Sequence, residues 1–287
     1  MCYDYNWLTA DFEYLENNYG FIEHITIGES VMKRSIHGVK IGTGRRQVLV
    51  TAAFHGLESI TAAIVMKFAS DYAARISDSN PFFGKNAAQL FVKNTLYVLP
   101  MINPDGVDIA AHGIDTSMPA HQRLVKSVGV CDFKRTWQAN ARGVDLNHNY
   151  DALWSAVHPS PSPSKYGGEC PESEPETKAL TTFVRRMQPD ILLAFHSQGG
   201  EIYCDFDGHC PEGALEIAEE MAAVSGYEVC RPTGTAAFGG CKDWFIREFD
   251  RPGFTIEVGH GQNPLPISML DEIYAENAKI ILCAMGK

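Results

Sequence analysis

Short apolar runs alternate along this chain with longer runs of helical spacing, and this alternation constrains the fold more than any other feature. Runs typical of strands buried on both faces lie at residues 47–54, 94–102, 190–195 and 253–259. Apolar residues recur at helical spacing in the stretches 59–76, 172–187, 212–226 and 267–285. Strands that alternate with helices predict an α/β fold with a mostly parallel sheet covered on both faces.

The sequence also predicts one helix start, one irregular segment and the number of domains. Ser173 and Glu176 have the spacing of a capping box, which predicts the start of the helix at 172–187. Residues 155–175 contain five prolines and are expected to be irregular, either as a solvated excursion or as a lid over a site. Because no internal repeat or linker divides the sequence, we expect residues 1–287 to form a single domain.

The composition argues against several classes of partner. The 287 residues include 24 Lys and Arg against 35 Asp and Glu, which gives a formal charge of −11. Nucleic acids and anionic membranes bind basic surfaces, so neither is expected as a partner. The N-terminus lacks the basic start and apolar run of a signal peptide, and the eight cysteines include no C-x-x-C pair. These features predict a cytoplasmic protein with reduced thiols.

Three of the four expected strands end near side chains that bind metals. His55 and Glu58 follow the first strand. His196 follows the third strand, and Glu257 lies near the end of the fourth. Ligands bind outside the carboxyl ends of the strands in such sheets, so we expect these residues to meet at one edge. The sequence NPDGVD at 103–108 predicts a turn beside the same edge.

Each of these residues also has a plainer interpretation. A lone buried histidine is usually a hydrogen-bonded core residue, and Glu58 could simply be a surface residue. Glu257 is harder to explain in this way, because an unpaired charge within FTIEV is costly to bury. Two histidines and one glutamate form the ligand set of a catalytic zinc site, which leaves a fourth position for water. Glu257 would then handle the proton of that water.

Five sequence blocks together resemble the zinc carboxypeptidases. They follow the order and spacing of that family over about residues 45–266: FHGLES, NPDGVD, NARGVDLNHNYD, AFHSQGGEIY and PGFTIEVGHGQNPLP. The resemblance implies a three-layer α/β sandwich around a mixed, mostly parallel sheet of about eight strands. It implies that Zn²⁺ is bound by His55, Glu58 and His196. It further implies Glu257 as the general base and acid, and Asn147 as a ligand of the substrate's terminal carboxylate.

Two departures from the family pattern bear on the substrate. His148 stands where the family has an arginine that grips a free C-terminal carboxylate, and a histidine offers at most one donor in place of that planar fork. The family's oxyanion-stabilising arginine aligns with Gln138, and Arg142 is the nearest arginine. The oxyanion is therefore expected to contact either Arg142 or Gln138.

With these departures, the chain resembles the branch of the family that cleaves bacterial cell-wall stem peptides between D-glutamate and a diamino acid. The implied substrate is a muropeptide, a small peptide of peptidoglycan. The residues expected to bind it are Asn147, His148, Gln198, Lys242 and Asp243. Lys242 or Asp243 would contact the far end of the diamino acid, although a salt-bridged helix start is a plainer interpretation of this pair. Three residues are expected to support the metal ligands: Asn103, Asp145 and Ser197.

The sequence is also compatible with two other kinds of function. One is an ordinary zinc carboxypeptidase, or a related amidohydrolase of N-acyl amino acids, with altered carboxylate recognition. Another is a binding module that has kept the fold and lost the metal. The complete set of His55, Glu58, His196 and Glu257 argues against the second alternative.

Overall fold

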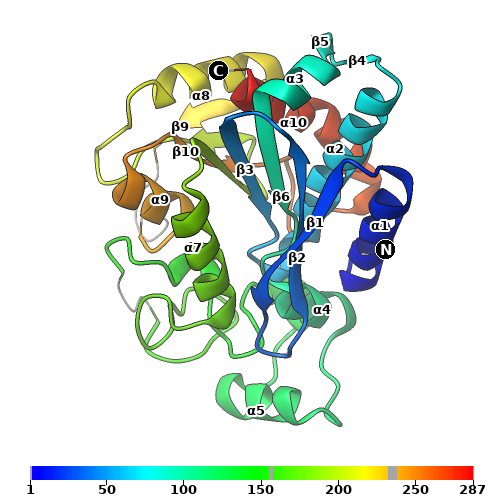
Figure 1. Ribbon diagram of the computed structural model, residues 1–287. Helices are drawn as coiled ribbons and strands as arrows, with labels where there is room; N and C mark the ends of the chain where they lie inside the picture. The colour runs from blue at the N-terminus through cyan, green and yellow to red at the C-terminus, as the bar shows by residue number, and fades with distance from the viewer. Residues whose placement is uncertain (1, 155–157, 232–237, 287) are drawn as a thin grey trace.

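A single sheet of eight strands forms the centre of the protein, in a computed structural model that describes residues 2–154, 158–231 and 238–286. The strands are β1 (Ile22–Glu29), β2 (Ser35–Gly42), β3 (Arg46–Ala52), β6 (Asn94–Leu99), β7 (Ile191–His196), β8 (Glu201–Tyr203), β9 (Glu228–Cys230) and β10 (Gly253–Glu257). They lie in the order β1-β2-β6-β3-β7-β10-β8-β9 (Figure 1). The pairs β6–β3, β3–β7, β7–β10 and β8–β9 are parallel, and the other three are antiparallel. This confirms the predicted fold class.

Helices cover both faces of the sheet (Figure 1). The longer helices are α1 (Tyr5–Asn18), α2 (Ser59–Ser77), α3 (Ala87–Lys93), α4 (Pro104–His112), α5 (Pro119–Val128), α7 (Pro175–Met187), α8 (Ala214–Ser225), α9 (Cys241–Phe249) and α10 (Leu270–Met285). Short elements complete the described chain: η1 (Gly56–Glu58), the β4–β5 pair (Pro81–Phe82 and Lys85–Asn86), α6 (Phe133–Thr136), η2 (Leu146–His148) and η4 (Ile267–Met269).

The alternation of side chains along β3 builds the two cores between the layers. Val48 and Val50 belong to a core that includes residues of α1, α2, α8 and α10. Leu49 belongs to a second core with residues of α7 and α9. Successive side chains of a strand point to opposite faces, so a continuous apolar run such as β3 must be covered on both sides.

Two details of the sequence prediction are wrong. NPDGVD does not form a turn, because Asn103 is the N-cap of α4 and its Oδ1 accepts a hydrogen bond from Gly106 N at 2.9 Å. The expected capping box of Ser173 and Glu176 is also absent. Helix α7 begins only at Pro175, and Oε1 of Glu176 accepts a hydrogen bond from the backbone N–H of Val31 instead.

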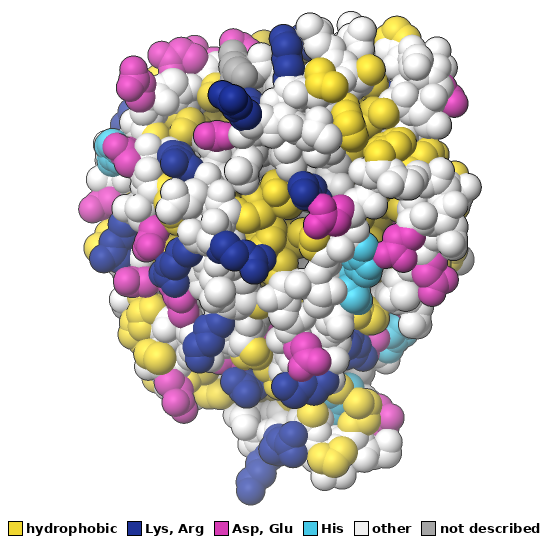
Figure 2. Space-filling view, in the orientation of Figure 1, with side chains coloured by type: hydrophobic (Ala, Val, Ile, Leu, Met, Phe, Trp, Pro, Cys, Tyr) yellow, Lys and Arg dark blue, Asp and Glu magenta, His cyan; other side chains and the backbone are white. Residues whose placement is uncertain are grey.

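The surface of the described residues is mixed in charge. On the face shown in Figure 2, acidic and basic side chains are interspersed, and apolar side chains line a hollow near the middle. None of the helices in the described parts of the chain is long and apolar enough to cross a bilayer.

Candidate metal centre and substrate pocket

The chain leaves β3 through a single 3₁₀ turn that brings two side chains together. β3 ends at Ala52, and His55 is the N-cap of η1, whose last residue is Glu58. Nδ1 of His55 lies 2.8 Å from Oε1 of Glu58. Residues three apart in a helical turn lie on the same side, which explains why this H-x-x-E spacing joins the two side chains. A Cβ at Gly56 would lie 2.4 Å from the carbonyl oxygen of Gly106, so only glycine permits this close approach of η1 and α4.

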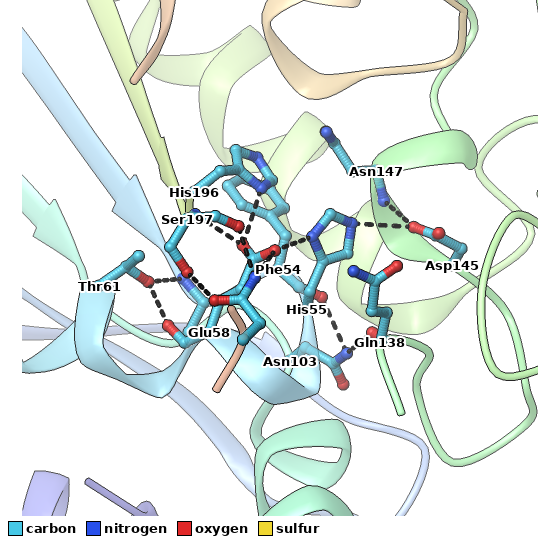
Figure 3. A network of polar contacts seen from close by, with 12 residues as sticks. Phe54, His55, Glu58, Thr61, Asn103, Gln138, Asp145, Asn147, His196 and Ser197 are labelled. Carbon is cyan, nitrogen blue, oxygen red and sulfur yellow. Dashed lines mark hydrogen bonds and ion pairs between the residues drawn. The ribbon is translucent and has the colours of Figure 1, made fainter. Parts of the chain in front are cut away.

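His196 and Glu257 reach the same edge from two neighbouring strands. In the parallel pair β7–β10, His196 and Glu257 are directly paired at the carboxyl ends. Nδ1 of His196 lies 3.2 Å from Oε2 of Glu58. One ligand atom from each of His55, Glu58 and His196 lies within 4.8 Å of the others, so these three residues could hold a metal ion. Figure 3 shows both imidazoles directed at the Glu58 carboxylate.

Buried negative charge makes this position attractive to a cation. Burial lowers the pKa of His55, but the carboxylates of Glu58 and Asp145 outweigh it and raise that pKa well above its ordinary value. Burial alone would raise the pKa of Glu58, but His55 and His196 lower it to about 2. Glu58 therefore keeps its charge although it is only 2% exposed. Two imidazole nitrogens and one ionised carboxylate are the ligand set of a catalytic zinc, and the residues present fit that ion.

Polar groups behind the ligands hold them in place. Nε2 of His55 lies 3.1 Å from Oδ1 of Asp145, and the backbone N–H of Ser197 lies 3.3 Å from Oε2 of Glu58. Asn103 does not contact a metal ligand directly. Its Nδ2 donates a hydrogen bond to the carbonyl oxygen of Phe54, the residue before His55 (Figure 3). Sequence reasoning missed Asn263, whose Nδ2 lies 3.5 Å from Oε1 of Glu58 and donates to Ser197 O at 2.7 Å. No local pattern marks Asn263, because only the fold of the segment after β10 brings it to the site.

Glu257 has a different environment from Glu58. Burial, together with the carboxylates of Glu58 and Glu201, raises the pKa of Glu257 to about 8, against the lowering effect of His55. Glu201 is the residue directly opposite Glu257 in the antiparallel pair β8–β10. A carboxylate with a pKa near neutrality can both take up and release a proton under physiological conditions.

A pocket of about 170 Å³ opens beside this centre. Its walls combine the metal-site residue His55 and Glu257 with ten further residues: Gln138, Asp145, Asn147, His148, Lys165, Tyr203, Gly240, Lys242, Asp243 and Thr255. Lys242 and Asp243 are 4% and 2% exposed, and their Nζ and Oδ1 atoms lie 2.5 Å apart at the first turn of α9. The pair is thus both a salt-bridged helix start and a part of the pocket wall.

Asn147 and His148 are held by backbone groups. Oδ1 of Asn147 accepts a hydrogen bond from Cys241 N at 2.9 Å. Nδ1 of His148 lies 3.0 Å from the carbonyl oxygen of Phe238. Since that nitrogen donates to a carbonyl, the remaining hydrogen-bonding nitrogen of His148 is Nε2.

Two of the residues predicted to act in catalysis or substrate binding lie outside this pocket. Arg142 is exposed, and its Nη1 atom lies 3.5 Å from Oε2 of Glu174, on a different part of the surface. Gln198 is also exposed, and its Oε1 accepts a hydrogen bond from Gly261 N at 3.2 Å. Between Arg142 and Gln138, only Gln138 lines the pocket. The expected roles of Arg142 and Gln198 therefore have no geometric support.

A larger cavity of about 540 Å³ lies on another side of η1. It is lined by Gly56 and Leu57, by residues of the N-terminal segment and by residues 264–267. None of the three candidate metal ligands and neither Glu257 nor the Lys242–Asp243 pair lines it, so the chemistry belongs to the smaller pocket.

The irregular segment after residue 157 packs against the site. The carbonyl oxygen of Pro163 accepts hydrogen bonds from Gln138 N at 2.9 Å and Ala139 N at 3.0 Å. Oδ2 of Asp145 accepts a hydrogen bond from Lys165 N at 2.8 Å. Residues 158–174 contain no helix or strand, as predicted, and residues 155–157 of the expected loop lie outside the described residues. Its role as a lid stays a prediction.

Comparison with known proteins defines the class. The zinc carboxypeptidase family (Peptidase M14) matches residues 8–280. "Gamma-D-glutamyl-L-diamino acid endopeptidase 1" of Lysinibacillus sphaericus is 37% identical over 99% of this chain and 72% of its own length. An uncharacterised Bacillus subtilis protein, YqgT, is 31% identical over 99% of this chain and 77% of its own.

The fold agrees with these relatives. The crystal structure of thrombin-activatable fibrinolysis inhibitor matches with a TM-score of 0.82 at 21% identity, over 100% of this chain and 74% of that one. The chain belongs to the zinc carboxypeptidase family and is a zinc-dependent metallopeptidase.

Proposed function

We propose that this metallopeptidase hydrolyses the bond between D-glutamate and a diamino acid in peptidoglycan stem peptides. The observation that carries the proposal is the Lys242–Asp243 pair, buried in the wall of the pocket beside the metal centre. A buried charge pair costs desolvation, and a hydrophobic side chain of the substrate would not compensate for it. The 37% identical relative, named as a γ-D-glutamyl-L-diamino acid endopeptidase, supports the same assignment.

The pocket matches the chemistry of a diamino acid. The far end of diaminopimelate carries one ammonium and one carboxylate group. The Lys242 ammonium pairs with that carboxylate, and the Asp243 carboxylate pairs with that ammonium. Asn147 and His148 contact the carboxylate next to the scissile bond. Gln138 donates to the carbonyl oxygen as negative charge develops there, in place of Arg142.

Glu257 performs the proton transfers in this proposal. His55, Glu58 and His196 would hold Zn²⁺, which would lower the pKa of water and polarise the scissile carbonyl. Glu257 takes the proton of the attacking water and passes it to the nitrogen of the departing diamino acid. Burial and the neighbouring carboxylates raise the pKa of Glu257, whereas Zn²⁺ beside it would favour the ionised form that takes up the proton of water.

The test compares two substrates. We expect L-Ala-γ-D-Glu-diaminopimelate to be cut to L-Ala-D-Glu and free diaminopimelate, with products identified by mass spectrometry. Peptides with α-linked hydrophobic C-termini should be poor substrates by kcat/KM. Equal or faster cleavage of the α-linked peptides would instead identify an ordinary carboxypeptidase. Cleavage of N-acyl amino acids alone would identify an amidohydrolase.

A variant tests the residue that carries the proposal. Lys242→Met removes a charge-assisted contact, so kcat/KM for the diaminopimelate peptide should fall by about 10–100-fold. The matched control is Lys178→Met on α7, where the lysine is exposed. Thermal unfolding shows whether the variant is folded. A folded Lys242→Met protein with unchanged kcat/KM would exclude Lys242 from substrate binding.

A further inference from the structure

Two cysteines face each other across a tight hairpin that follows β8. Sγ of Cys204 and Sγ of Cys210 lie 3.8 Å apart. Between them, Phe206 and His209 form an antiparallel bridge with backbone N···O distances of 2.8 and 2.9 Å. Asp207 and Gly208 form the turn with φ of 49° and 78°, as a two-residue type I′ hairpin requires. The hairpin therefore keeps the two thiols close.

The two thiols differ in their access to solvent. Cys204 is 3% exposed, whereas Cys210 is exposed. Burial, with the neighbouring Cys210, raises the pKa of the Cys204 thiol to about 12. An external oxidant thus meets Cys210 first, and Cys204 is positioned to react second.

The same hairpin supports the substrate pocket. Tyr203, the last residue of β8, lines the pocket and directly precedes Cys204. Nζ of Lys242 donates a hydrogen bond to the carbonyl oxygen of Asp205, the residue after Cys204. Lys242 is thus held by the hairpin on one side and by Asp243 on the other. A change in the hairpin can therefore reach Lys242 through the carbonyl group of Asp205.

We propose that Cys204 and Cys210 are a site of reversible disulfide formation that alters the substrate pocket through Lys242. The co-reactant is a low-molecular-weight disulfide, RSSR. The Cys210 thiolate attacks one sulfur of RSSR, which forms a mixed disulfide and releases RS⁻. The Cys204 thiol then gives its proton to the RS⁻ released in the first step and attacks the Cys210 sulfur, which releases the second RS⁻. Two cysteine thiols are oxidised, RSSR is reduced, and the two cysteine protons are taken up by the two released thiolates.

Closing this bond requires movement in the hairpin. A disulfide has an S–S distance of about 2.05 Å, so the sulfurs must approach well beyond the 3.8 Å seen here. Cys204 is buried directly after β8. Most of the movement that brings the two sulfurs together must therefore come from the exposed arm of the hairpin, which carries Cys210. The Phe206–His209 bridge joins the two arms, so movement of the Cys210 arm also displaces the Asp205 carbonyl next to Phe206 and weakens its hydrogen bond to Lys242. Side chains that position a substrate tolerate such displacements poorly, so KM should rise by about 3-fold or more.

Mass spectrometry tests bond formation without any turnover. The reduced protein is incubated with oxidised glutathione, its free thiols are alkylated, and the digest is analysed. We expect a cross-link between Cys204 and Cys210 that dithiothreitol reverses. The Cys204→Ser variant should accumulate glutathione on Cys210, and the control Cys170→Ser, at another exposed cysteine, should still form the cross-link. A glutathione adduct that persists on Cys210 of the wild-type protein would overturn the proposal.

Kinetics test the coupling to the pocket. KM is measured for the best peptide substrate, before and after oxidation, in the wild-type protein and in Cys210→Ser. We expect the oxidised wild-type protein to show a higher KM and the variant to be insensitive to glutathione disulfide. If the cross-link forms while KM is unchanged, the coupling through Lys242 is wrong. Because the cross-link is detected without substrate, its failure is distinguishable from a wrong assignment of the diamino acid substrate.

Discussion

Nε2 of His55 lies 3.1 Å from Oδ1 of Asp145, although 90 residues separate them in the sequence. The other ring nitrogen of His55 faces Glu58, so Asp145 orients the imidazole from behind the metal centre. Asp145 itself is fixed by the backbone N–H groups of Asn147 and Lys165. A carboxylate behind a ligating histidine fixes its tautomer and raises its basicity.

This relationship gives the first prediction. Asp145→Asn keeps the shape of the side chain and removes its charge, so zinc affinity should fall by about 10–100-fold. Competition with a chelator of known affinity measures the effect. Asp151→Asn, at an exposed aspartate paired with Arg247, is the matched control. Unchanged zinc affinity in Asp145→Asn would show that the contact between Asp145 and His55 does not orient the imidazole.

The second prediction concerns the metal ligands. We expect one zinc per wild-type chain by elemental analysis, and loss of zinc and activity in His55→Ala and His196→Ala, because each removes one ligand of three. His209→Ala, at an exposed histidine paired with Asp250, should keep the metal. Full zinc occupancy in His196→Ala would remove His196 from the ligand set.

The third prediction separates metal binding from chemistry. Glu257→Gln keeps the volume of the side chain and removes the proton acceptor, so zinc content and fold should survive. Turnover should fall by about 10²–10⁴-fold or more, the usual contribution of a general acid–base group. Glu228→Gln on β9, where the glutamate is exposed, should be fully active. Near wild-type kcat in Glu257→Gln would require another base.

The fourth prediction concerns stability and pH. Burial raises the pKa of Glu176 to about 7, and the nearby Asp105 and Glu174 add to this effect. The folded state therefore binds a proton that the unfolded state releases at about pH 4.5. Stability from this group is present in full below about pH 4.5 and is lost as the pH rises through 7.

A substitution isolates this contribution. Glu176→Gln does not titrate, so its stability relative to wild type (free energy of unfolding of the variant minus that of the wild type) should increase by about 3 kcal/mol between pH 4.5 and pH 8. Urea unfolding at several pH values measures this change. For Glu216→Gln, at an exposed position on α8, the difference should be independent of pH. A pH-independent difference for Glu176→Gln would show that its carboxyl group is already ionised in the folded state.

Local patterns in the sequence were enough to indicate the strands, the mostly parallel sheet and the residues at the strand ends. An apolar run such as residues 48–54 has few alternatives to a strand covered on both faces, and a parallel sheet must bring its carboxyl ends to one edge. His55, Glu58, His196 and Glu257 could be grouped for that reason before any contact was known. The zinc carboxypeptidase family followed from five sequence blocks, and the comparisons confirm it.

Tertiary structure alone decided which side chains complete the site. Asn263 and Tyr203 lie in segments whose position depends on contacts with distant parts of the chain, so no local periodicity marks them. The same reason explains the missing capping box, since the Glu176 carboxylate accepts a hydrogen bond from Val31 N, 145 residues away, rather than from the start of its own helix. Packing also decides why Gln138 lines the pocket while Arg142 pairs with Glu174. The direction of a side chain on an irregular segment is set by the contacts around it, and the sequence encodes those contacts only through the whole fold.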